Sequence, residues 1–294
     1  MPPLGPANPS HTVIAMETRA LVLGGGGVTG IAWELGLLHG LAEGGVDLSA
    51  AEVVIGTSAG SVVGAQVAAG TTLAELYAAQ LEPADAEIGA KFGTGTLVRM
   101  ALPAIIPGSP YTKRRRIGRA ALRAHPESAD ARLAVIRSRI GVTDWPERDL
   151  RITAVDATTG RLRVFTRDTG VDLVHAVAAS CAVPIVWPPV RIDGVPYVDG
   201  GMRSATNADL ATGAQRVVVV APLVQSFSRH MSIGNQLSRL RASGTTASAV
   251  ISPDEASLAA IGRNVLDPAK RADAARAGLC QAATALDRVR DAWS

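Results

Sequence analysis

The stretch EVVIGTSAG, residues 52–60, decides the fold class of this chain. Its apolar run, 53–55, leads directly into a glycine turn, and residues 59–69 continue with the small and apolar pattern of a buried helix. A second apolar run, 20–23, leads in the same way into a glycine turn and a helical pattern over 31–42. Repeated strand–turn–helix units predict an α/β protein with a parallel sheet.

Two further apolar runs, 152–155 and 217–221, have the continuous hydrophobicity of strands buried on both faces. Shorter segments at 161–166 and 196–198 predict antiparallel strands, because each follows a turn that contains glycine. The alanine-rich residues 252–294 predict two closing helices, with Pro268 at the start of the second.

Composition excludes several classes of protein. The 294 residues are 47% hydrophobic and 19% charged, which is enough apolar material for a sizeable core and too little charge for a disordered chain. The net charge is only +3, and aromatic residues are 3% of the chain, so no base-stacking platform and no nucleic-acid partner are expected. Two widely spaced cysteines, Cys181 and Cys280, predict neither a disulfide framework nor a metal site, and they fit a reducing, cytoplasmic compartment.

The ends and the middle of the chain differ from the α/β pattern. Residues 1–17 carry no basic start and no long apolar run, so we expect a disordered tail rather than a signal peptide, followed by one domain over 18–294. The uncharged residues 53–74 contain four glycines and lack the apolar density of a membrane span. Residues 71–139 show no strand pattern and several prolines, which predicts a helical insertion over the sheet.

The insertion carries a concentrated positive charge. Lys113, Arg114, Arg115 and Arg116 are consecutive, and no acidic residue lies between Glu87 and Glu127. Such a run is either a solvated helix face or linker, or a segment that docks on an anionic lipid surface. In the second case, Ile105, Ile106, Ile117 and Leu122 are the apolar side chains expected to insert shallowly, giving peripheral membrane binding.

Ser58 is the strongest candidate for a catalytic residue. It is the central residue of a G-x-S-x-G motif, 56–60, between a predicted strand and a predicted helix. A sharp turn at this point lifts a serine hydroxyl clear of the backbone and places it at a helix N-terminus, where an anion is favoured. The alternative is a turn that uses small residues only for close packing.

The glycine-rich loop 24–30 comes between the first predicted strand and its helix. A dinucleotide site would need an acidic residue at the end of the second strand, where Ser58 stands instead, and no Lys-Ser or Lys-Thr follows the glycines as a P-loop requires. Four successive glycines do present unobstructed N–H groups close to the neighbouring strand end. We therefore interpret the loop as an oxyanion hole, with no cofactor.

Asp199 is the candidate base. It stands in YVDGG, residues 197–201, at the end of a short apolar run, although Asp-Gly is also among the commonest turn pairs. None of the five histidines lies in a turn after a strand, as a triad histidine would.

A glycine-rich loop, GTSAG and DGG, in this order and over residues 19–221, resemble the patatin-like phospholipases, which are serine lipid acyl hydrolases with a Ser–Asp dyad. The segments 178–184 and 187–189 are similar to a further stretch of that family. The resemblance implies a single three-layer α/β/α domain with a mostly parallel sheet, Ser58 as nucleophile, Asp199 as base, and the amides of Gly25, Gly26 and Gly27 as oxyanion donors. It implies an ester-hydrolysing enzyme that acts on phospholipids or lysophospholipids. Thr29 departs from the family, many of whose members carry Arg or Lys there.

Three other functions remain open at this point. A serine acyltransferase or thioesterase shares G-x-S-x-G, but histidine normally precedes its serine, and here the residue is Thr57. A carboxylesterase would use Ser58, Asp199 and His230 in that order. A lipid-binding module that keeps the fold without catalysis is the third.

Overall fold

The structure is a computed structural model that describes residues 17–83, 106–124, 129–224 and 228–294. The predicted tail therefore lies outside the described residues except for Glu17, and so does a large part of the predicted insertion.

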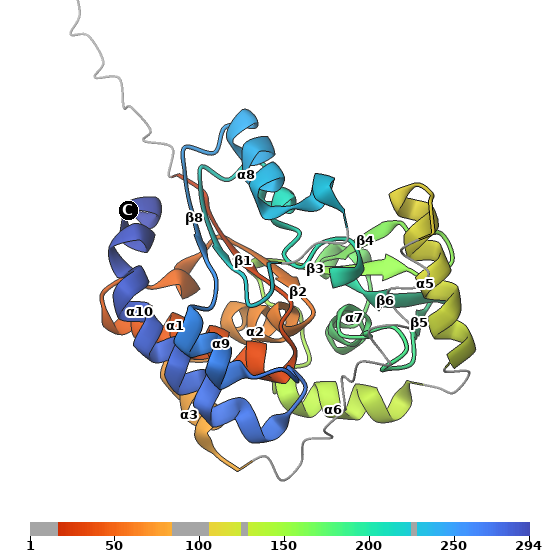
Figure 1. Cartoon of the computed structure of the whole chain (residues 1–294), viewed down its shortest axis with the longest axis horizontal. Coiled ribbons are helices and arrows are strands. Elements are labelled where there is room, and N and C mark those ends of the chain that lie inside the picture. The colour runs from red at the N-terminus through yellow and green to blue at the C-terminus, as the bar shows by residue number, and fades with distance from the viewer. Residues whose placement is uncertain (1–16, 84–105, 125–128, 225–227) are drawn as a thin grey trace, which may run out of the picture.

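An open, mostly parallel sheet of eight strands forms the centre of the protein (Figure 1). The strands are β1 (Arg19–Leu23), β2 (Val53–Thr57), β3 (Asp149–Asp156), β4 (Leu162–Phe165), β5 (Val190–Ile192), β6 (Val195–Asp199), β7 (Arg216–Val220) and β8 (Ala247–Ile251). Their order is β5-β6-β3-β2-β1-β7-β8, and β4 pairs with β3. The five neighbouring strands β3, β2, β1, β7 and β8 are parallel to one another, whereas β4 and β6 run antiparallel to β3.

Helices cover both faces of the sheet. They are α1 (Gly27–Glu43), α2 (Ala59–Ala68), α3 (Leu73–Leu81), α5 (Pro110–Ala124), α6 (Asp130–Ile140), α7 (Leu173–Ser180), α8 (Ile233–Ala242), α9 (Glu255–Ile261) and α10 (Arg271–Trp293), with short 3₁₀ turns between them. Along β1, Leu21 and Leu23 join a core with α1, α2, α7 and α10, while Ala20 and Val22 face α8. This alternation makes three layers, visible in Figure 1 with α8 on one side of the sheet and α1 and α10 on the other.

The predicted fold class is confirmed, and so are the six strands expected from the sequence. Two strands were missed: β5 has only three residues, and β8 has polar or small residues at most of its positions. The first helix begins at Gly27, four residues earlier than expected, because the glycine loop itself makes its first turn. The helices predicted in 252–294 correspond to α9 and α10.

The described parts of residues 71–139 are helical, but they contact different parts of the molecule. α3 packs on α1 and α10, α6 packs on α7 and α2, and α5 lies at the antiparallel end of the sheet. The boundaries of an insertion stay a prediction. Within α5, Ile117 is only 2% exposed and packs against Val155 and Val198, so the expectation that it inserts into a membrane is wrong.

Candidate active site

Ser58 lies at a sharp turn between β2 and α2. Its backbone has φ 52° and ψ −117°, a left-handed conformation that a non-glycine residue adopts only under strain. The glycines on either side are required by space. A Cβ on Gly60 would overlap the backbone of Leu23, and one on Gly56 would lie 2.5 Å from the Cα of Ser61. The G-x-S-x-G spacing therefore lets α2 begin directly against the end of β1.

Hydrogen bonds hold both backbone groups of Ser58. Its N–H donates to the hydroxyl of Ser180 at 2.9 Å, and its carbonyl accepts from the Ser61 hydroxyl at 2.6 Å and the Cys181 thiol at 3.2 Å. Burial, reinforced by the charge of Asp199, raises the pKa of the Cys181 thiol to about 11, so this thiol remains a donor. Ser180 and Cys181, in the segment 178–184, thus hold the backbone of the turn at Ser58 by hydrogen bonds.

Asp199 reaches Ser58 through the pairing of three strands. Thr57 is in register with Thr153 of β3, and Ala154 is in register with Asp199 of β6. These two pairings bring together residues that are 141 positions apart in the sequence. The Asp199 carboxylate accepts a hydrogen bond from the N–H of Gly201 at 2.7 Å, and the Ser58 side chain lies close enough to lower the pKa of this carboxyl.

Burial sets the acidity of Asp199. The residue is 5% exposed, and desolvation raises the pKa of its carboxyl to about 6, although the neighbouring Ser58 side chain and the hydrogen bond from Gly201 act in the opposite direction. At neutral pH such a carboxyl is mostly ionised, and it is more basic than an exposed aspartate. It can accept the proton of a neighbouring hydroxyl.

The glycine loop lies beside Ser58. A Cβ on Gly25 would stand 3.5 Å from the Ser58 Cβ. The Gly25 N–H already donates to the carbonyl of Ala205 at 2.8 Å, so the expectation that this amide holds an oxyanion is wrong. In the part of the chain that the structure describes, the amides of Gly26 and Gly27 have no hydrogen-bond partner. These two amides, at the N-terminus of α1, remain the candidate oxyanion donors.

The histidines that the structure describes do not contact Ser58 or Asp199. His175 contacts Asp172 at 3.1 Å, and the backbone carbonyl of the exposed His230 accepts from Arg239. His39 stacks on Tyr77. Among the described residues, none of these three hydrogen-bonds to Ser58 or Asp199, whereas His11 and His125 lie outside the described ranges. A Ser58–Asp199–His230 triad has no support in this geometry.

Asn207 is a site residue that sequence reasoning missed. Its side chain is fully buried, and its amide Nδ2 donates to the hydroxyl of Thr57 at 3.0 Å and to the carbonyl of Gly200 at 3.3 Å. Asn207 thus contacts the residue before Ser58 and the residue after Asp199. The only local signal was a turn-forming Asn eight positions after Asp199, which is too common to single out.

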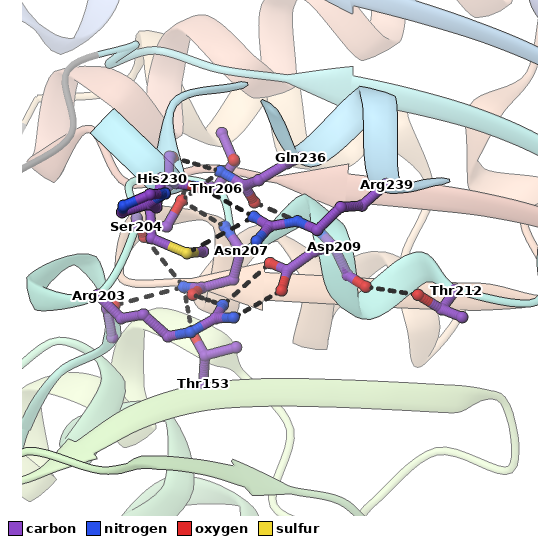
Figure 2. Close-up of polar contacts among 12 residues, drawn as sticks. Thr153, Arg203, Ser204, Thr206, Asn207, Asp209, Thr212, His230, Gln236 and Arg239 are labelled. Atoms are coloured by element: carbon purple, nitrogen blue, oxygen red, sulfur yellow. Dashed lines mark hydrogen bonds and ion pairs between the residues drawn. The ribbon is translucent and has the colours of Figure 1, made fainter. Parts of the chain in front are cut away.

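A wider polar network fixes the loop that follows Asp199 (Figure 2). The Nε2 of Gln236 donates to the Ser204 hydroxyl at 2.8 Å, and that hydroxyl accepts from the N–H of Asn207 at 3.1 Å. Arg203 binds Asp209 with both terminal nitrogens, at 2.5 and 3.0 Å. The loop is therefore anchored to α8 and to the edge of the site.

Three further features concern the surroundings of Thr29, metal-binding side chains and membrane-spanning helices. Thr29 is buried and its hydroxyl donates to the carbonyl of Val265 at 3.3 Å, so it does not face a surface where it would meet a headgroup. Across the described ranges, no group of three or more His, Cys, Asp or Glu side chains could hold a metal ion. In the same ranges, no helix is long and apolar enough to cross a membrane.

A serine on a strained strand-to-helix turn of a mostly parallel sheet is an arrangement typical of α/β serine hydrolases. The sequence model of the patatin-like phospholipases matches residues 21–212, and the chain belongs to that family. The family is that of lipid hydrolases, as the order of motifs predicted.

Two solved structures are similar to this chain. VipD from Legionella pneumophila has 15% identity and a TM-score of 0.47 over 92% of this chain and 67% of VipD. The type III effector protein ExoU has 18% identity and a TM-score of 0.38 over 91% of this chain and 53% of ExoU. No curated protein sequence matches the chain.

Proposed function

We propose that this protein hydrolyses ester bonds in phospholipids or lysophospholipids, with Ser58 as nucleophile and Asp199 as the base. The observation that carries the proposal is the approach of the Ser58 side chain to the buried Asp199 carboxyl, brought about by the pairing of β2, β3 and β6. Membership of the patatin-like phospholipase family supports a lipid ester as the substrate class.

The proposed reaction has two stages. Asp199 accepts the Ser58 proton while Oγ attacks the ester carbonyl carbon, and the amides of Gly26 and Gly27 stabilise the oxyanion that forms. As the tetrahedral intermediate collapses, the ester C–O bond breaks and the leaving alcohol takes the proton from Asp199. Water then attacks the acyl-enzyme, Asp199 accepts a proton from it, and the same carboxyl returns that proton to Oγ as the fatty acid leaves.

A fluorophosphonate probe tests the nucleophile directly. We expect covalent labelling at Ser58, located by mass spectrometry of the digested protein. Ser58→Ala removes the label, while Ser238→Ala, an exposed serine on α8, leaves it unchanged. A screen of lipid-extract hydrolysis with mass analysis of the products identifies the headgroup and acyl chain. Wild-type protein that reacts with neither probe nor lipid would favour a lipid-binding module without catalysis.

The basic segment Lys113–Arg116 is proposed to bring this enzyme to anionic membranes from the cytoplasm. On α5, Arg115 and Arg119 are exposed, and so are Ile106 and Tyr111 just before or at the start of the helix. Arg116 is held by the carbonyls of Ile106 and Pro107, at 3.0 and 3.1 Å. These side chains provide a charged and partly apolar surface.

Co-sedimentation with vesicles tests the membrane contact. Binding is expected to rise with the anionic lipid fraction and to fall with salt, because each basic residue near such a surface contributes about 1 kcal/mol. Replacing Arg115 and Arg116 by Gln then weakens binding roughly tenfold or more. The control pair Arg241→Gln and Arg288→Gln removes the same charge from exposed positions on α8 and α10. Equal losses in both pairs would argue for nonspecific attraction.

A further inference from the structure

A small cavity lies between α5 and the turn that follows Asp199. Its lining includes Lys113, Arg114 and Ile117 from α5, and Met202 and Arg203 from the turn, and its volume is about 80 Å³. A single water requires about 10–15 Å³ by the same measure, so the space suits a group of several heavy atoms rather than an acyl chain. Three cationic side chains and an apolar floor form its walls.

Arg203 is already neutralised within the protein. Its terminal nitrogens bind both carboxylate oxygens of Asp209, and Nη1 also donates to the Asn207 side chain at 2.7 Å (Figure 2). These contacts fix the guanidinium in place. Arg203 is therefore a rigid wall of the cavity, and the net positive charge comes from α5.

Arg114 is a half-buried cation with no carboxylate partner among the described residues. Its Nε donates to the carbonyl of Gly160 at 2.6 Å, and its guanidinium lies 4.8 Å from the centre of the Tyr111 ring. Burial, together with the charge of Arg203, lowers the pKa of this guanidinium, although Tyr111 acts in the opposite direction. Within the described ranges, the Nη groups of Arg114 have no hydrogen-bond partner, and Arg114 lines the cavity.

Lys113 adds a second cation that has no acidic partner in the described ranges. Lys113 stands in the first turn of α5 and Arg114 directly follows it; no acidic residue is present in that turn, and the helix dipole disfavours positive charge there. A bound anion would offset both the dipole and the mutual repulsion of the two cations.

We propose that this cavity binds the phosphate group of a phospholipid headgroup while the ester lies at Ser58, an inference that rests on the proposed function for the identity of the ligand. Arg203 is four positions after Asp199, across a 3₁₀ turn that rises about 2 Å per residue, so the Cα atoms of these two residues are roughly 8 Å apart. In a glycerophospholipid the phosphate and the ester carbonyl are joined through a few glycerol bonds. The cavity then acts as a specificity site for phosphate-bearing lipids over neutral glycerides.

Non-hydrolysable ligands test the cavity without relying on catalysis. An ether-linked lysophospholipid and the matching 1-O-alkylglycerol, both used below their micelle concentrations, are titrated calorimetrically into the full chain. The lysophospholipid is expected to bind at least about tenfold more tightly, because charge-assisted hydrogen bonds to the phosphate are lost in the neutral ether. Arg114→Gln and, separately, Lys113→Gln reduce this preference, whereas Arg123→Gln, an exposed cation at the far end of α5, keeps it.

The outcomes separate the proposals. Equal binding of the two ethers by the wild type would overturn the cavity proposal even if esters are hydrolysed, and an equal loss in Arg123→Gln would do the same. A preference that depends on Lys113 and Arg114 would support it even if hydrolysis fails. Inorganic phosphate is titrated as a separate arm. Inorganic phosphate that binds as tightly as the ether-linked lysophospholipid, without displacing it, would mean that the cavity takes free phosphate. The assignment of the cavity to a lipid headgroup would then be wrong.

Discussion

The side-chain amide of Asn207 donates to the hydroxyl of Thr57 at 3.0 Å, across 150 positions of sequence. Thr57 precedes the candidate nucleophile, and the same amide also contacts the carbonyl of Gly200, next to the candidate base. One buried amide therefore connects the two turns that carry Ser58 and Asp199. We expect the distance between these two side chains to depend on it.

Asn207→Ala is predicted to reduce kcat by more than about tenfold and to destabilise the fold by roughly 2–4 kcal/mol. The substitution leaves the hydroxyls of Thr57 and Thr153 without this buried partner. Kinetics well below the melting temperature, with KM measured separately, distinguish misplacement of the dyad from unfolding. Thr212→Ala is the control, since that exposed hydroxyl bonds only to the carbonyl of Asp209. An unchanged kcat in Asn207→Ala would reject the positioning role.

Ser58→Ala is predicted to lower ester hydrolysis by more than about 10²-fold, because the nucleophilic oxygen is removed. The fold should persist, since alanine adds no atom to the turn. Circular dichroism and thermal unfolding check the fold, and release of fatty acid measures the activity. Activity above one hundredth of wild type would exclude Ser58 as the nucleophile.

The pH dependence of kcat/KM is predicted to report the Asp199 carboxyl. Its pKa of about 6 means that the base is protonated and inactive in acid, so kcat/KM rises through pH 6 and levels off above it. Asp199→Asn should abolish this profile together with the activity, because an amide accepts no proton. If Asp199→Asn stays active and His175→Ala or His230→Ala is inactive, a triad replaces the dyad.

Asp199→Asn is also predicted to stabilise the protein at neutral pH. The pKa in the folded state is raised from 3.8 to about 6, so the folded protein holds the proton more tightly than the unfolded chain. Wild-type stability from this group is therefore present below pH 4 and is lost as pH rises to 6, by up to about 3 kcal/mol. Denaturant unfolding at pH 4 and pH 7 measures the difference between the two proteins. Glu34, whose pKa burial also raises, contributes equally to both and cancels.

Gly60→Ala is predicted to destabilise the fold by more than about 3 kcal/mol, because its Cβ would overlap the backbone of Leu23 where α2 meets β1. Gly234→Ala on α8 is the matched control. No atom lies within 4 Å of the added methyl there, and the change should gain a few tenths to about 1 kcal/mol of helix propensity. Chemical denaturation of both variants provides the comparison, and equal effects would contradict the packing argument.

The sequence alone determined the α/β class, the positions of the main strands along the chain, and Ser58 and Asp199 as candidate site residues. These features rest on local physics: continuous apolar runs for buried strands, and small residues where a strand turns sharply into a helix. The family motifs are local as well, and this is why their order along the chain was sufficient to predict the family.

Only the tertiary structure decided which groups are free and which are already paired. The Gly25 N–H donates to the Ala205 carbonyl, Ile117 faces the core instead of a membrane, and β8 gains strand structure by pairing with β7 although most of its residues are small. The role of Asn207 depends on Thr57, a partner in another element, and that of Arg203 depends on Asp209, which the loop brings back beside it. Each is a contact whose energy depends on burial and geometry between distant segments, and such contacts leave no period or spacing in the sequence.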